Sequence, residues 1–242
     1  MFADDCEMAY GEQAALVGVL AQLQPVLALE IGTYEGGSLA LIAKFVQQVH
    51  TFDLVSHVKK PLPNVIYHLG DSRRTVPALL SGFAAAGQSV DFVLIDGDHS
   101  RKGVAADVAN ILDSPAVTRA VVMLHDVANE GVRAGIRDAG LDRSKIAYAN
   151  LSFVPPWEHT PVLRETWGGL GILVNNEDGD FWPRERRIDT NVAWPTAVSR
   201  SPLWHALRPV REAKRIASYQ VRPLMRRVRG SRGASLTQQD DG

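Results

Sequence analysis

Two patterns of hydrophobic and polar positions take turns along this chain. One has the spacing of a helix and the other is a short apolar run, so the sequence predicts strands that are followed by helices. An apolar pattern with helical spacing occupies residues 11–23 and ends near Pro25. Short, nearly continuous apolar runs follow, as expected for strands buried on both faces. We expect these strands over residues 26–31, 49–53, 65–69, 90–95 and 120–124. We expect helices between them over residues 38–48, 75–85 and 101–112.

This succession of strands and helices predicts an α/β fold with a doubly wound, mostly parallel sheet and right-handed crossovers. Two further strands are expected over residues 145–154 and 169–174, which makes the predicted sheet seven-stranded. Residues 155–168 separate those two strands and are rich in Pro, His and Trp. Long loops are uncommon in compact domains unless they have a function, so we interpret this segment as a lid.

Polar side chains follow each of the first five predicted strands. The carboxyl ends of parallel strands meet at one edge of a sheet, and open α/β sheets bind their ligands there. The sequence therefore predicts a ligand site at this edge. The polar positions are Glu30 with the turn after it, Asp53, Gly70-Asp71-Ser72, Asp96-Gly97-Asp98-His99-Ser100 and His125-Asp126.

Residues 30–38, Glu-Ile-Gly-Thr-Tyr-Glu-Gly-Gly-Ser, form a glycine-rich turn between a strand and a helix. Small residues let the backbone approach a ligand, and a helix N-terminus offers unpaired N–H groups. The spacing is neither a dinucleotide fingerprint nor a Walker loop, because no Lys-Ser/Thr follows the second glycine cluster. The turn therefore favours a ligand with hydroxyls and a cationic centre, and it disfavours a nicotinamide oxidoreductase.

Taken together, these motifs resemble class I S-adenosylmethionine-dependent methyltransferases over residues 25–175. Within that class they look like metal-dependent sugar O-methyltransferases and cephalosporin-hydroxylase-like proteins. The most specific part is Asp-Gly-Asp-His-Ser at residues 96–100, followed about 27 residues later by His-Asp. The resemblance implies a Rossmann-like methyltransferase fold and S-adenosyl-L-methionine as the cofactor. The residues implied around the cofactor are Glu30, Gly32, Thr33, Tyr34, Gly37, Ser38, Asp53, Asp71, Ser72 and Asp96.

Within this set, the resemblance implies separate places along the cofactor. Glu30 and the glycine-rich turn are expected around the methionine end, where a carboxylate offsets the ammonium and sulfonium charges. Asp53 is expected to accept hydrogen bonds from the ribose hydroxyls, as an acid does in dinucleotide sites. Asp71 and Ser72 are expected near the adenine. For each acid, a role in capping a helix or in a solvated turn stays open.

The resemblance also implies a divalent metal held by Asp96, His125 and Asp126. Oxygen ligands favour Mg²⁺. His125 stands where such enzymes often carry an oxygen ligand, and imidazole binds Mg²⁺ poorly, so Mn²⁺ and Fe²⁺ stay open. Asp98 is open to two roles, as a further ligand or as a cap of the helix at 101–112. A metal-free acidic pocket is the alternative.

His99 occupies the position of the catalytic base in the sugar O-methyltransferases that this segment resembles. A sugar hydroxyl is a weak nucleophile, so its proton must leave as the C–O bond forms. A neutral imidazole within hydrogen-bond reach suits that task. His125 is the rival base, with the two roles exchanged. A His99 that only bonds a nearby carboxylate is the structural alternative.

Charge divides the chain into two parts. Residues 200–232 hold ten Lys or Arg and one acid, Glu212, although the net charge of the whole chain is −1. We therefore predict an N-terminal helix at 1–24, a cofactor-binding catalytic domain at 25–199, a basic amphipathic arm at 200–229 and a disordered tail at 230–242. The arm suits an anionic membrane, an acidic protein or a sister subunit, and we expect a homo-oligomer that binds no nucleic acid.

The remaining composition narrows the location and the function. A single cysteine, Cys6, an acidic N-terminus and the lack of a long apolar run favour a soluble, cytoplasmic protein. The predicted function is methyl transfer to a hydroxyl of a sugar or glycosylated small molecule. Trp157, Trp167 and His159 are candidate acceptor contacts. A catechol or phenol methyltransferase and a non-catalytic docking subunit that keeps the cofactor pocket remain open.

Overall fold

The computed structural model describes residues 6–156, 159–160, 165–177 and 187–189. Their strands form one large sheet in the order β10-β6-β9-β5-β4-β1-β2-β3, and β9 alone runs antiparallel to its neighbours β5 and β6. The strands are β1 (Leu27–Ile31), β2 (Gln48–Asp53), β3 (Val65–Leu69), β4 (Phe92–Ile95), β5 (Arg119–His125), β6 (Ile146–Val154), β9 (Leu170–Asn176) and β10 (Arg187–Asp189). The predicted seven-stranded, doubly wound sheet is confirmed, and β10 adds a three-residue edge strand.

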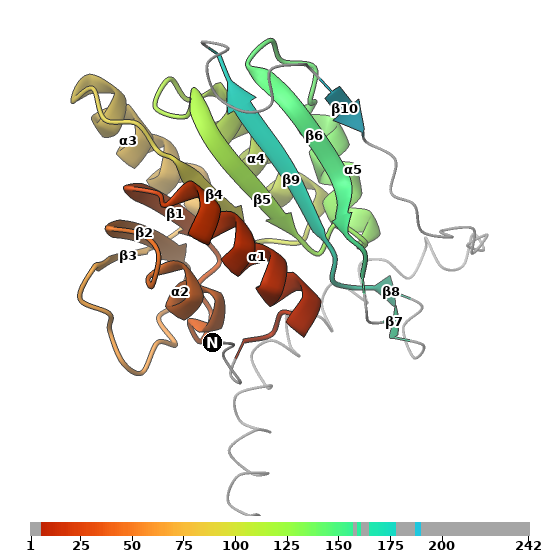
Figure 1. Cartoon of the computed structure of the whole chain (residues 1–242), viewed down its shortest axis with the longest axis horizontal. Coiled ribbons are helices and arrows are strands. Elements are labelled where there is room, and N and C mark those ends of the chain that lie inside the picture. Colours follow the sequence, from red (N-terminus) through yellow and green to blue (C-terminus); the bar gives the residue numbers. More distant parts are fainter. Residues whose placement is uncertain (1–5, 157–158, 161–164, 178–186, 190–242) are drawn as a thin grey trace, which may run out of the picture. The chain divides into compact units, whose positions relative to one another are not determined.

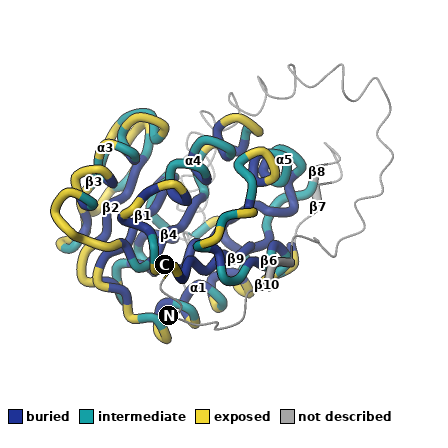
Figure 2. The backbone as a smooth tube through the Cα atoms, turned by 90° about the horizontal axis from the view of Figure 1, so that it is seen from above, coloured by how far each residue is buried: buried dark blue, intermediate teal, exposed yellow. Residues whose placement is uncertain are grey.

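Helices cover both faces of this sheet (Figure 1). Helices α1 (Tyr10–Leu23) and α2 (Gly37–Ile42) lie on one face. Helices α3 (Ser72–Ala85), α4 (Arg101–Asp113) and α5 (Glu130–Ala139) lie on the other. Figure 2 shows that the central strands β1, β4, β5 and β9 are buried, whereas β3, β6 and the outer sides of the helices are partly exposed.

Two helices differ from the sequence prediction for physical reasons. Helix α2 ends at Ile42, well before residue 48, because the Asn64 side chain donates to the carbonyls of Ala43 (2.9 Å) and Val46 (2.8 Å). Helix α5 was not predicted, because its glycines interrupt the apolar pattern. They permit close packing: a Cβ on Gly135 would lie 2.6 Å from the Cβ of Val104 in α4.

The core consists of two apolar layers, one on each face of the sheet. Alternation along each strand divides its residues between the layers. In β1, Leu27, Leu29 and Ile31 face helices α3 to α5, while Ala28 faces α1 and α2. Glu30 follows the same alternation and therefore lies on the α1–α2 face, fully buried. The fold thus places a carboxyl group inside the apolar layer beside the glycine-rich turn.

The segment predicted as a lid contains a two-stranded hairpin, β7 (His159–Thr160) with β8 (Glu165–Thr166). The arm at 200–229 and the tail at 230–242 lie outside the described residues, as does Trp157. Within the described part of the chain, no helix has both the length and the apolar character that crossing a membrane requires.

Candidate active site

The glycine-rich turn lies directly against the end of β4. Gly32 adopts φ +97°, and a Cβ there would overlap the carbonyl of Asp96. The backbone N–H of Asp96 donates to the Ile31 carbonyl at 2.8 Å, and that of Gly32 donates to the Phe52 carbonyl at 2.8 Å. Only glycine fits this contact. The predicted cofactor turn and the predicted metal residue therefore adjoin each other.

Glu30 holds the glycine-rich turn in place through hydrogen bonds. Its carboxyl group accepts from the Ser38 hydroxyl at 2.7 Å and from the Thr51 hydroxyl at 2.7 Å, and Thr33 lies 2.5 Å from Thr51, oxygen to oxygen. Burial raises the pKa of Glu30 to about 8, although the two hydroxyl hydrogen bonds oppose the change. Glu30 thus ties β1 to the start of α2 and to β2, rather than facing open space.

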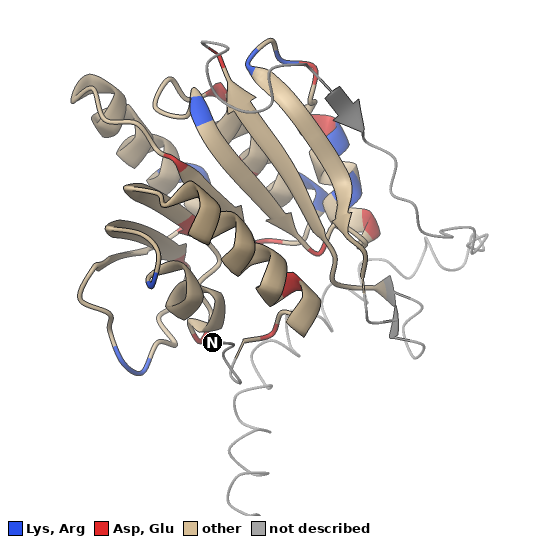
Figure 3. Ribbon diagram, viewed as in Figure 1, with Lys and Arg blue, Asp and Glu red and all other residues tan. Residues whose placement is uncertain are grey.

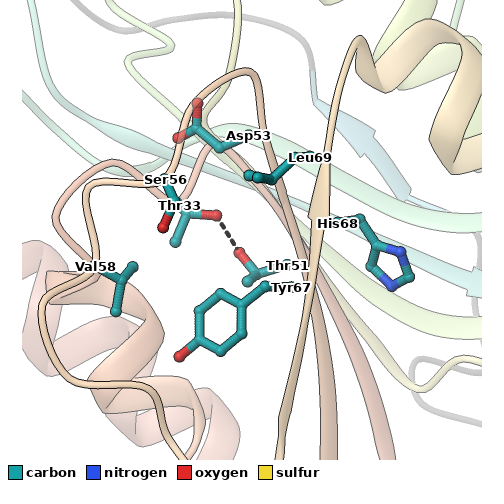
Figure 4. Close-up of a pocket in the computed structure, with 8 residues that line it drawn as sticks. All are labelled: Thr33, Thr51, Asp53, Ser56, Val58, Tyr67, His68 and Leu69. Carbon is teal, nitrogen blue, oxygen red and sulfur yellow. Dashed lines mark hydrogen bonds between the residues drawn. The ribbon is translucent and has the colours of Figure 1, made fainter.

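Asp53, at the end of β2, holds the other side of the turn. Its carboxylate accepts from the backbone N–H of Tyr34 at 2.7 Å, and Tyr34 has the positive φ of 47°. Asp53 is partly exposed. It lines a small pocket shown in Figure 4. The residues around this pocket are Thr33, Thr51, Asp53, Ser56, Val58, Tyr67, His68 and Leu69.

Asp71 and Ser72 stand at the end of β3 and have protein partners in this structure. Asp71 caps α3 by accepting from the backbone N–H of Arg73 at 3.0 Å, and the hydrogen bonds and charge of the Arg73 side chain lower its pKa. The Ser72 hydroxyl donates at 2.7 Å to Asp107, which is buried in α4. Both predicted residues therefore lie at the expected edge, and their role toward adenine stays a prediction.

Asp96, His99 and Asp126 converge where β4 and β5 end. His99 Nε2 lies 3.3 Å from Asp96 Oδ1 and 3.0 Å from Asp126 Oδ2. Their side chains are 21% exposed for Asp96 but only 9% and 10% exposed for His99 and Asp126, so the cluster opens on the Asp96 side. Acidic residues lie at this edge of the sheet and also at its opposite edge (Figure 3).

The ionisable groups in this cluster shift one another's pKa values. Burial alone would lower the pKa of His99, but its hydrogen bonds to Asp126 and Asp96 outweigh burial and raise the pKa to about 9. Burial would raise the pKa of both acids, yet the charge of His125 and the histidine hydrogen bonds bring both below their usual range. The protein therefore holds ionised carboxylates here at neutral pH.

His125 lies beside this cluster, with each ring nitrogen facing a carboxylate. Its Nδ1 is 3.0 Å from Asp96 Oδ1, and its Nε2 is 3.2 Å from Glu12 Oε2. Ionised carboxylates only accept hydrogen bonds, so this arrangement suits a ring that carries a proton on both nitrogens. Burial opposes that state, but the charges of Asp96 and Asp126 raise the pKa of His125 well above its usual value.

Glu12 was missed in the sequence interpretation. It lies in the first turn of α1 and is 2% exposed. The spacing of Glu12, Leu16 and Leu20, each four residues apart, places all three on one helix face. Leu16 and Leu20 belong to the apolar layer that also contains Met123, and by alternation along β5 His125 shares that face. A carboxyl group on an apolar helix face was the available signal.

The donor set fits a divalent cation. Within the described parts of the chain, one group of side chains has three potential ligand atoms within 4.8 Å of one another: Asp96, His99 and Asp126. Two carboxylates suit Mg²⁺, Mn²⁺ or Fe²⁺, and an imidazole beside them favours Mn²⁺ or Fe²⁺ over Mg²⁺. This group contains His99, whereas the sequence interpretation had named His125 as the third ligand. Asp98 instead bonds the N–H and hydroxyl of Ser100, each at 2.8 Å, at the start of α4.

Trp167 borders the cluster at His99. Its ring meets His99 edge to face, with centroids 5.4 Å apart and an interplanar angle of 90°. Trp167 is partly exposed. It immediately precedes Gly168 and Gly169, which lead into β9. An aromatic ring therefore lies next to the candidate base, at the end of the segment predicted as a lid.

Comparison with known proteins identifies the kind of domain. Residues 29–127 match the sequence model of a methyltransferase domain, whereas no curated protein matches the chain. The match agrees with the predicted class of enzyme, and it runs from within β1 to just past the end of β5.

Solved structures share the fold at low identity. An O-methyltransferase from Bacillus cereus, in complex with SAH (S-adenosylhomocysteine), is 16% identical with a TM-score of 0.52, over 72% of this chain and 84% of that chain. TomG, an O-methyltransferase from Streptomyces achromogenes involved in tomaymycin synthesis and solved with SAM, is 19% identical with a TM-score of 0.53, over 72% and 83%. The fold is thus that of class I methyltransferases.

Proposed function

We propose that this chain is an S-adenosylmethionine-dependent O-methyltransferase whose acceptor is a hydroxyl of a sugar or glycosylated small molecule. In this proposal Asp96 and Asp126 hold a divalent cation, and His99 is the general base. The observation that supports it most is the direct contact of the glycine-rich turn with Asp96, at Gly32. A methyl donor at the turn and an acceptor at the cluster would then be neighbours.

On the donor side, the backbone of the turn from Gly32 to Ser38 would surround the methionine end of the cofactor. Asp53 keeps a partly exposed carboxylate at the pocket of Figure 4, where it can accept from ribose hydroxyls. Because Glu30 is fully buried, its part is to fix the turn through Ser38 and Thr51. Its negative charge, when ionised, also favours the cationic ligand.

On the acceptor side, the reaction needs a proton to leave the hydroxyl while the carbon–oxygen bond forms. When bound, a divalent cation at Asp96 and Asp126 supplies positive charge that lowers the pKa of a hydroxyl and offsets both carboxylates. With both carboxylates offset in this way, the cause of the raised His99 pKa would be removed, and Nε2, the ring atom that faces the cluster, would be free to take the proton of the hydroxyl. General-base catalysis of this kind contributes about 10²–10⁴-fold to the rate.

A sugar acceptor is favoured by the surroundings of His99. Trp167 presents a ring beside it, and an aromatic face packs well on the apolar face of a pyranose. An aliphatic hydroxyl also needs a base more than a phenol does, since a phenol is far more acidic. A catechol acceptor would make His99 dispensable. Activity that survives the loss of His99 would therefore favour a catechol over a sugar as the acceptor.

The roles of His99 and Asp126 can be separated with the full chain. We expect SAH to raise the melting temperature and NADP to leave it unchanged. With an acceptor found in a panel of saccharides and catechols, His99→Ala should lower kcat by about 10²–10⁴-fold while the affinity for Mn²⁺ stays near wild type. Asp126→Asn should weaken Mn²⁺ binding, whereas its matched control Asp138→Asn, at an exposed carboxylate paired with Arg101, should not.

Each outcome has a definite meaning. Loss of Mn²⁺ binding in His99→Ala would make His99 a metal ligand rather than the base. Unchanged turnover in that variant, or full activity in excess chelator, would contradict the proposed mechanism. SAH binding without methyl transfer to any member of the panel would favour a non-catalytic docking subunit. The cytoplasmic location, the basic arm and the homo-oligomer stay predictions.

A further inference from the structure

Glu12 lies outside residues 29–127, the methyltransferase domain, yet its carboxylate reaches the candidate site. The side chain is 3% exposed. Its Oε2 accepts from the backbone N–H of Ala9 at 2.7 Å and lies 3.2 Å from His125 Nε2. Its Oε1 accepts from the backbone N–H of Gly169. One buried carboxylate thus joins α1, the end of β5 and the start of β9.

Gly168 and Gly169 form a turn that two carboxylates hold in place. The N–H of Gly168 donates to Asp126 Oδ1, and the next N–H, that of Gly169, donates to Glu12 Oε1. Both glycines have positive φ, +81° and +83°, and a Cβ on Gly168 would lie 3.0 Å from Glu12 Oε1. The carbonyls of the turn accept from the backbone N–H groups of Ala128 (3.1 Å) and Val127 (3.4 Å), so the turn depends on the two acids for the partners of its own N–H groups and on glycine for its shape.

This turn sets the position of the preceding residue, Trp167. The Trp167 ring contacts His99 edge to face at 5.4 Å. Asp126, which holds one end of the turn, also lies 3.0 Å from His99. Glu12 holds the other end and also contacts the His125 ring, so we expect its effect on His99 to pass through Trp167 or through His125.

From these contacts we infer that Glu12 is a positioning residue for the acceptor side of the site. It fixes the Gly168–Gly169 turn, and with it the ring of Trp167 beside His99. It also fixes the orientation of the His125 ring toward Asp96. The kinetic consequence rests on the proposed function, because it concerns an acceptor with an apolar face that packs on Trp167. The effect of Glu12 on the positions of the turn and of the two rings does not depend on the proposed function.

Two measurements on the full chain need no acceptor. Loss of the Glu12 carboxylate exposes the Gly169 N–H, so Glu12→Ala should raise its hydrogen-exchange rate about tenfold or more. The ring C–H signals of His99, assigned by their loss in His99→Asn, should shift toward their positions in Trp167→Phe. Glu12→Gln keeps the volume and an acceptor oxygen, so it should show the same changes at smaller size. The matched control Gln13→Ala, a buried neighbour in the same helix turn, should show neither change.

A third measurement tests the link to the reaction. With an acceptor that the wild type methylates, Glu12→Ala should raise the acceptor KM about tenfold, while the affinity for SAH stays within about twofold. Glu12→Gln should recover part of the loss. Wild-type exchange at Gly169 with unmoved His99 signals, in either variant, would overturn the inference, as would an unchanged acceptor KM. If the wild type methylates no acceptor, the proposed function fails, and the exchange and ring signals still decide the role of Glu12.

Discussion

Two histidines at the edge of the sheet differ in what their ring nitrogens face, and the difference separates their roles. His125 has a carboxylate at each nitrogen, Asp96 at 3.0 Å and Glu12 at 3.2 Å, so both nitrogens have hydrogen-bond partners inside the protein. His99 directs Nε2 at the Asp96–Asp126 pair and lies against Trp167. The contacts of the two rings could not be read from the order of the residues, because they depend on which neighbours the fold brings to each ring.

Glu30 leads to a prediction about stability and pH. Its pKa is about 8 in the folded protein, well above that of a carboxyl in an unfolded chain, so it is largely protonated when folded and ionised when unfolded at neutral pH. Raising the pH from about 4.5 to 8 therefore favours unfolding, at up to about 1.4 kcal/mol per pH unit. Glu30→Gln should remove this dependence. As the pH rises, the free energy of unfolding should therefore fall in the wild type more than in Glu30→Gln.

Urea unfolding at a series of pH values measures the effect. The exposed control Glu7→Gln should follow the wild type at every pH. Parallel curves for Glu30→Gln and wild type between pH 5 and 8 would show that the Glu30 carboxyl group ionises normally in the folded protein.

At the scale of elements, the strands followed their hydrophobic runs closely, while helices departed from prediction where tertiary contacts decided. The expected strand at 65–69 is β3, Val65–Leu69, without change. Helix α2 is short because Asn64 bonds the carbonyls beyond it, and α5 exists because it packs closely on α4. Both causes lie in residues distant along the chain, so local patterns could not contain them.

Two helical glycines give a matched test of that packing. Gly135 in α5 leaves no room for a Cβ, which would lie 2.7 Å from the Arg101 carbonyl, whereas Gly82 in α3 has nothing within 4 Å. Gly135→Ala should therefore destabilise the protein by about 1–3 kcal/mol through overpacking. Gly82→Ala should be neutral or stabilise it by up to about 1 kcal/mol, because alanine favours helix. Equal effects of the two substitutions on the free energy of unfolding would contradict close α4–α5 packing.

At the scale of the described body, the placement of the site followed from topology. Parallel strands bring their carboxyl ends to one edge, so Asp53, Asp71 and Asp96 could be assigned to that edge before any contact was known. The residues that contact these side chains from distant parts of the chain could not be assigned in the same way. Glu12 is 113 residues from His125 along the chain, and Gly169 is 157 residues from Glu12. Only packing of α1 over the ends of β5 and β9 brings them together.

The central claim is that a divalent cation and the cofactor share this edge, at the contact between the glycine-rich turn and Asp96. Bound Mn²⁺ broadens the proton signals of a ligand that lies close to it. In a mixture of the full chain, Mn²⁺ and SAH, the account predicts strong broadening of the SAH methylene protons beside sulfur, and its loss in Asp126→Asn. Sharp SAH signals in the wild type, with both ligands shown to be bound, would contradict the account.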